Sequence, residues 1–162
     1  MSRDIKIKNK DGIGFWIDKA DIEVLSHFLI QIFDKYNLKS KNEIFDDMYD
    51  VLDFNRQGIR YSTTNIYLQF LETQDDINTM IRVLEDAKVL IAEQGEFITV
   101  DFINGLNQYR DKTEHWNWDK PIFTSSFIKV LDIMILMLKG KWQETDKRIW
   151  LKGHASEGFE ET

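Results

Sequence analysis

The sequence predicts an α+β fold, with a mixed or antiparallel sheet of four to six strands and three to four amphipathic helices packed on it. Three observations support this prediction. Short β-type segments recur along the chain, apolar residues repeat at the helical period between them, and Asp11-Gly12 and Asn104-Gly105 are turn dipeptides. We expect one globular domain over residues 1–152 and a frayed acidic tail over residues 153–162.

The first elements expected are a hairpin and a largely buried helix. Residues 4–10 alternate between isoleucine and charged side chains, Asp11-Gly12 forms the turn, and residues 13–17 supply the second strand. Asp18 is the expected N-cap of a helix that ends near Asn37. Apolar residues occupy most sides of this helix, so we expect it to lie inside the core.

The most informative segment is residues 42–56, which read NEIFDDMYDVLDFNR and contain no base before Arg56. At helical spacing Asp46, Asp50 and Asp53 share one stripe, while the residues that anchor the helix collect on another face. An acidic helix of this kind is a ready surface for something cationic. The anchoring residues are Ile44, Met48, Val51, Leu52 and Asn55, and the exposed face carries Glu43, Asp46, Asp47, Asp50 and Asp53.

The middle of the chain alternates between strand and helix signals. Residues 59–71 are rich in β-branched and aromatic side chains, which predicts a strand. A helix over residues 77–91 follows, capped by Thr73 or Asp75, and Gly95 ends it.

The next segment has two interpretations. Residues 96–103 read as a strand, with Asn104-Gly105 turning the chain into residues 106–110. A helix over residues 99–112 is the alternative, because the apolar residues there also suit helical spacing. Periodicity does not choose between them.

A polar and aromatic loop is expected over residues 112–123, and it carries Trp116 and Trp118. Tryptophan is enriched at the energetic centres of interfaces, because it buries a large area at little entropic cost. Tryptophans beside a core helix also serve as covers for that core. The loop is therefore either a set of interface anchors or a lid.

The final helix is expected over residues 127–138, with Thr124 or Ser125 as its cap. Almost all of its residues are apolar, which indicates either the central core helix or a homodimer interface. Residues 141–151 contain two tryptophans and are expected to add a terminal strand.

Composition narrows the function classes. The chain has no cysteine, so disulfides, thiolate metal sites and thiol nucleophiles are excluded. The formal charge is −7, and residues 43–101 alone contain 13 acids against four bases. Such a field repels nucleic acid and attracts basic partners. The longest apolar run is too short to span a bilayer, and no signal peptide pattern opens the chain, so we expect a cytoplasmic protein without a membrane partner.

The sequence contains few residues that match motifs for catalysis or cofactor binding. Asp46-Asp47-Met48-Tyr49-Asp50 matches the DDxxD pattern by which prenyl diphosphate synthases hold magnesium, but the second aspartate motif is missing. His27, between apolar neighbours, is expected to be a hydrogen-bonded histidine at the edge of the core. His115 has carboxylates nearby that could tune it for acid–base work, although no nucleophile motif accompanies it. We expect no metal, no cofactor and no catalytic residue.

The sequence is therefore typical of a small acidic binding protein that neutralises a basic partner. Bacterial toxin-immunity proteins and phage-encoded inhibitors share this profile, and a nuclease toxin is one target that would suit the charge. The alternatives are a small enzyme that uses His115 and a homo-oligomeric structural subunit. The expected partner-binding residues are Asp46, Asp47, Tyr49, Asp50, Asp53, Trp116 and Trp118.

Overall fold

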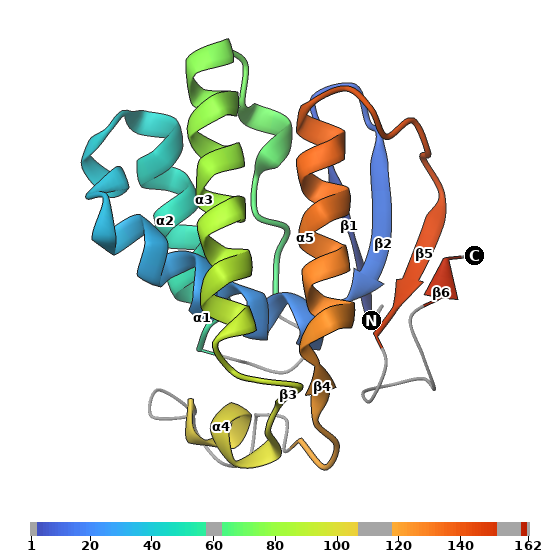
Figure 1. Ribbon diagram of the computed structural model, residues 1–162. Helices are drawn as coiled ribbons and strands as arrows, with labels where there is room; N and C mark the ends of the chain where they lie inside the picture. Colours follow the sequence, from blue (N-terminus) through green and yellow to red (C-terminus); the bar gives the residue numbers. More distant parts are fainter. Residues whose placement is uncertain (1–2, 58–62, 107–117, 152–159, 162) are drawn as a thin grey trace.

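The α+β class is confirmed by a computed structural model, which describes residues 3–57, 63–106, 118–151 and 160–161. Two strands open the chain, the helices α1 to α3 follow in succession, and strands and helices alternate after α3 until β5 and β6 end the chain (Figure 1). Two short 3-10 turns, η1 and η2, join α1 to α2 and α2 to α3. The helices are α1 (Lys19–Lys35), α2 (Glu43–Asn55), α3 (Gln74–Ala92), α4 (Val100–Gly105) and α5 (Thr124–Leu138). The 3-10 turns are η1 (Leu38–Ser40) and η2 (Leu68–Phe70).

The strands fall into two separate sheets, so the single sheet of four to six strands that we expected is not confirmed. The larger sheet is mixed and has the order β1-β2-β5-β6, with β2 and β5 parallel and the other pairs antiparallel. Only two residues form β6, and the separate pair β3-β4 is equally short. The strands are β1 (Asp4–Lys8), β2 (Gly14–Asp18), β3 (Phe97–Ile98), β4 (Ile122–Phe123), β5 (Lys147–Trp150) and β6 (Glu160–Glu161).

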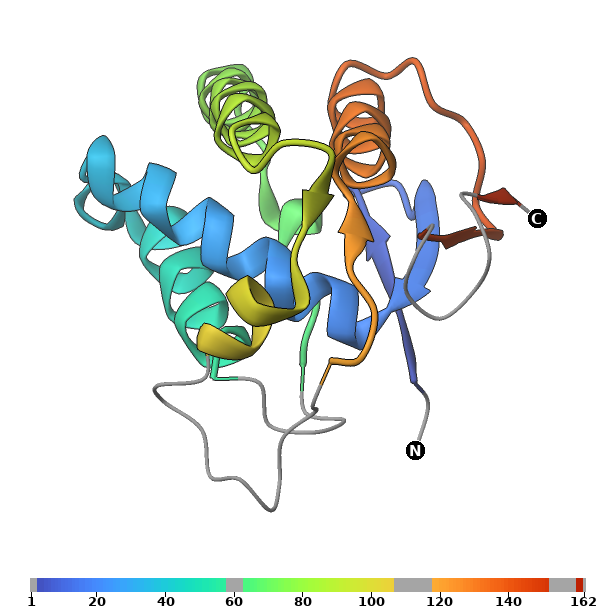
Figure 2. The ribbon, with the colours of Figure 1, turned by 60° about the horizontal axis from the view of Figure 1, so that its bottom comes forward.

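Helix α1 lies at the centre of the helical layer, as its apolar pattern predicts. The carboxylate of Asp18 accepts a hydrogen bond from the Ala20 backbone N–H at 2.9 Å, which confirms the expected N-cap. Every residue from Ala20 to Ile30 is buried. Figure 2 shows α3 and α5 nearly end-on and side by side, with α1 running across beneath them and the larger sheet beyond α5.

The strand predicted over residues 59–71 is wrong for its described part, residues 63–71, which contain η2 and no strand. The cause is a contact with the end of α2. The buried Asn55 side chain accepts a hydrogen bond from the Thr64 backbone N–H at 2.9 Å and donates one to the Thr64 carbonyl at 2.8 Å. Tyr67 then takes a left-handed φ of 64°, which turns the chain out of the extended conformation.

The hairpin predicted at Asn104-Gly105 is also wrong. In the described part of the segment the helical alternative fits better, because Asn104 and Gly105 belong to α4, which follows the short strand β3. Residues 107–112 of both alternatives lie outside the described residues. The Thr99 hydroxyl accepts a hydrogen bond from the Phe102 backbone N–H at 3.1 Å and so caps α4. The Asn104 amide is drawn instead to the backbone of Trp118, which it contacts through two hydrogen bonds of 3.0 Å.

Helix α5 begins three residues before the predicted start. Of the two alternatives for it, a core helix or a homodimer interface, the structure agrees with the core helix. Thr124 is its first residue rather than its side-chain cap, and the Thr124 hydroxyl donates to the Gly95 carbonyl at 2.6 Å. Most of its apolar side chains are buried against the same chain, and Leu136 is 36% exposed. Of the expected C-terminal tail, residues 153–159 and 162 lie outside the described residues, and residues 160–161 pair with β5.

Candidate functional site: the α2 face

Helix α2 is held by one side, which leaves its acidic side to the solvent. Asn42 caps it, accepting a hydrogen bond from the Phe45 backbone N–H at 3.0 Å, while the same side chain donates to Asp76 on α3. The face toward α1 buries five side chains, namely Phe45, Met48, Val51, Leu52 and Asn55. All of these except Phe45 belong to the predicted anchoring set, whereas Ile44 is only half-buried.

Part of the expected acidic stripe is neutralised by nearby bases. The Lys39 ammonium, which follows α1 in η1, lies 2.6 Å from an Asp46 carboxylate oxygen and 3.0 Å from one of Asp50. These hydrogen bonds raise the pKa of Lys39. The Arg56 guanidinium lies 2.8 Å from a carboxylate oxygen of Asp53. The stripe of Asp46, Asp50 and Asp53 is therefore an ion-pair network rather than a row of bare carboxylates.

Tyr49 is built into the junction between α1 and α2. Its hydroxyl donates a hydrogen bond to Asp34 on α1 at 2.9 Å, and this bond raises the pKa of the Tyr49 phenol. Its ring packs 6.5 Å from the ring of Phe33, and the Lys39 ammonium lies 4.9 Å from its centroid. Tyr49 as a whole is only half-buried, so part of it reaches the surface.

Asp47 and Glu43 form a second acidic group on α2, and both are exposed. Neither forms an ion pair within the part of the chain that the structure describes. Asp47 lines a pocket of about 150 Å³ together with Ile44, Tyr67 and Phe70. The pocket thus combines one carboxylate with an aliphatic and two aromatic side chains.

Three aromatic residues near this face were not predicted as site residues. Phe70 is 48% exposed, and its ring meets that of Tyr67 edge-on at 5.2 Å. Phe54 is 40% exposed on α2 itself. Its spacing from Asp47 and Asp50 puts it on the acidic face, so the pattern could have shown it. Tyr67 and Phe70 carried no such signal, because they were assigned to a strand.

Of the two predicted tryptophan anchors, the structure describes Trp118. Trp118 is 6% exposed and belongs to the hydrophobic core, which matches the lid interpretation of its loop. Trp116 and His115 lie outside the described residues, so their expected roles as anchor and as acid–base group stay predictions.

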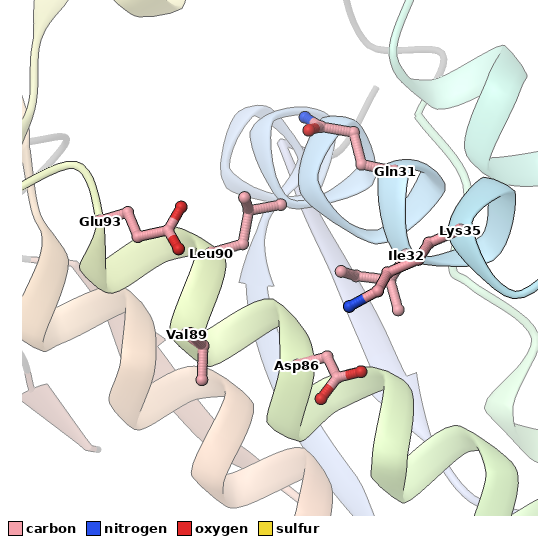
Figure 3. A pocket seen from close by; sticks show the side chains of 7 residues that line it. All are labelled: Gln31, Ile32, Lys35, Asp86, Val89, Leu90 and Glu93. Atoms are coloured by element: carbon pink, nitrogen blue, oxygen red, sulfur yellow. The ribbon is translucent and has the colours of Figure 1, made fainter.

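A second pocket, of about 270 Å³, lies between α1 and α3. Figure 3 shows its lining side chains, which project from the two helices around the opening. They carry both signs of charge, since Lys35 is present with Asp86 and Glu93. The lining residues are Gln31, Ile32, Lys35, Asp86, Val89, Leu90 and Glu93.

Two ionisable groups inside α1 have pKa values shifted by burial. Burial, and then the neighbouring Asp18 carboxylate, raise the pKa of Asp21. Burial, and then the Arg56 guanidinium, lower the pKa of His27 to about 4, so that His27 is neutral at pH 7. A hydrogen bond with the Arg56 backbone acts in the opposite direction on that pKa, while the Nε2 atom of His27 has no hydrogen-bond partner among the residues that the structure describes. No cluster of three or more metal-binding side chains occurs in the described part of the chain.

Comparison of the chain with protein-family models, with curated proteins and with solved structures finds no match. Among the residues that the structure describes, no helix combines the length and apolar character needed to cross a bilayer.

Proposed function

We propose that this chain is a small acidic binding protein of the cytoplasm that neutralises a basic partner, in the manner of an immunity protein or an inhibitor. A nuclease toxin is one such partner, because the acidic face would cover its phosphate-binding surface. The observation that carries the proposal is the outward face of α2, where the exposed carboxylates of Glu43, Asp47 and Asp50 share one side of the helix with the exposed ring of Phe54.

The charge distribution supports this interpretation. Residues 43–101, which carry the acidic excess of the sequence, include both α2 and α3. The two helices meet at their N-terminal ends, where the Lys41 ammonium lies 2.6 Å from Asp75 and 3.1 Å from Asp76. Since one lysine serves two carboxylates there, the surface between the helix ends stays net negative. A negative field of this extent steers a basic protein toward the face and speeds association.

The experiment begins with affinity capture from the native host and identification of the basic protein retained. Association of that protein with the chain is then followed at low ionic strength. We expect charge reversal at Asp46, Asp50 and Asp53 to slow association by about tenfold or more, and the difference to shrink as salt is added.

A matched control changes the same net charge elsewhere. Glu96, Asp119 and Glu144 are exposed, and none of them forms an ion pair within the described residues. Charge reversal at these three positions is expected to slow association much less. Equal association rates for the wild type and the α2 variant would contradict the proposal and would mean that the acidic face only keeps the protein soluble.

A further inference from the structure

We infer that the pocket of Ile44, Asp47, Tyr67 and Phe70 receives a single arginine side chain of the partner, an inference that rests on the proposed function. The cavity of about 150 Å³ is smaller than the roughly 300–1,000 Å³ of sites for cofactors and drug-sized ligands. Its size therefore suits one side chain of a protein.

The aromatic side of the pocket is held in place before any partner arrives. The Tyr67 backbone N–H donates to the Asn65 side chain at 3.2 Å, and the Phe70 backbone N–H donates to the Tyr67 carbonyl at 3.0 Å. The preceding Thr64 is tied to Asn55 of α2 through its backbone. A pocket arranged in advance costs less conformational entropy when it is filled.

The chemistry of the walls favours a cation with an apolar stem. Asp47 supplies a carboxylate without an ion-pair partner in the described chain, whereas Asp46 and Asp50 already contact Lys39. The exposed ring of Phe70 offers a face on which a planar cation can stack. The hydrocarbon stem of the same side chain can lie against Ile44.

Arginine meets these requirements better than lysine. Its guanidinium is planar and weakly hydrated, stacks on aromatic rings, and pairs with a carboxylate through two parallel hydrogen bonds. Lysine carries a compact and strongly hydrated charge, so it loses more solvation on entering an aromatic pocket. The pocket between α1 and α3 lacks this selectivity, because its own Lys35 lies among its acids.

The test uses three capped pentapeptides that differ at the central residue, which is arginine, lysine or citrulline, with glycine at the other positions. Citrulline keeps the shape of arginine and removes its charge. Binding to the full chain is followed by NMR through the methyl groups of Ile44 and the ring of Phe70. We expect millimolar binding of the arginine peptide, at least about fivefold tighter than that of either other peptide.

Two variants in the pocket and two controls outside it locate the binding. Asp47→Asn and Phe70→Ala should each lower the affinity for the arginine peptide by about fivefold or more. Glu93→Gln and Val89→Ala alter an exposed carboxylate and a 62% exposed apolar side chain of the other pocket, and should leave the affinity unchanged. Equal affinity for arginine and lysine, or binding insensitive to Asp47→Asn, would overturn the inference.

The outcomes separate this inference from the proposed function. If the arginine peptide does not bind while charge reversal at Asp46, Asp50 and Asp53 still slows association with the captured partner, the pocket assignment is wrong and the proposed function stands. If the peptides bind while that charge reversal has no effect, the function falls and the pocket stands. A dimer in solution that Phe70→Ala dissociates would assign the pocket to a second copy of the chain and overturn the arginine assignment.

Discussion

Helices α1 and α2 both combine acids with apolar residues, yet their charges lie in opposite surroundings. In α1, Asp21 and Glu23 are 2% and 1% exposed, because other elements of the fold surround the helix (Figures 1 and 2). In α2, Asp47 and Asp50 face the solvent, because the helix lies at the margin of the molecule and packs by one side. A charge buried in α1 acts on folding, whereas under our proposal a charge exposed on α2 acts on association.

The largest expected difference between the two helices is in the stability lost when a phenylalanine is replaced by alanine. Phe33 of α1 is fully buried against the ring of Phe45, whereas Phe54 of α2 is 40% exposed. Phe33→Ala is expected to lower the free energy of unfolding by about 3–5 kcal/mol, since it removes apolar contacts and leaves a cavity. Phe54→Ala should change it by less than about 0.5 kcal/mol. Urea unfolding of both variants measures the contrast, and similar losses would contradict it.

A second prediction concerns pH and the buried histidine of α1. His27 has a pKa of about 4 when folded, against 6.5 ordinarily, so the unfolded chain binds its proton more readily. The resulting stabilisation is complete above pH 6.5 and is lost as the pH falls to 4. Its full size corresponds to about 3 kcal/mol.

The measurement compares the wild type with His27→Gln, which keeps a polar side chain without a titration in this range. The free energy of unfolding of the wild type relative to the variant should fall by about 3 kcal/mol between pH 7 and pH 4. The raised pKa of Asp21 acts in the opposite sense, favouring the folded state at low pH, and is common to both proteins. A constant difference across that range would show that His27 titrates normally.

A further, small effect on stability is expected from the ion pairs of α2. Lys39→Met removes the contacts to Asp46 and Asp50, and because these groups are exposed to water, the free energy of unfolding should fall only slightly. The same change makes the face more negative and should speed association with a basic partner at low salt. Lys120→Met is the matched control, since Lys120 is exposed and forms no ion pair within the described residues. A loss of stability for Lys39→Met alone that approaches the loss expected for Phe33→Ala would mean that these pairs hold α2 in place.

Sequence patterns correctly predicted the features that depend only on neighbouring residues, such as helix caps. Asp18 caps α1 as expected, and Thr73, one of two candidates, caps α3 by accepting a hydrogen bond from the Asp76 backbone N–H at 3.1 Å. Gly95 has the positive φ of 87° that a glycine after a helix favours. The turn predicted at Asn104 does not form, and the Asn104 side chain bonds instead to Trp118, 14 residues away. Turn propensity depends on adjacent residues and does not account for a hydrogen-bond partner so far along the chain.

The sequence by itself determined the spans of the long helices, the opening hairpin and the acidic character of α2, because periodicity, capping and charge depend on neighbouring residues. Tertiary structure alone decided which of those acids remain free. Lys39 reaches Asp46 and Asp50 because η1 folds back beside α2, and Asp47 meets Tyr67 and Phe70 because Asn55 ties the following loop to the helix. Such contacts join segments many residues apart, so they follow from packing rather than from any local pattern.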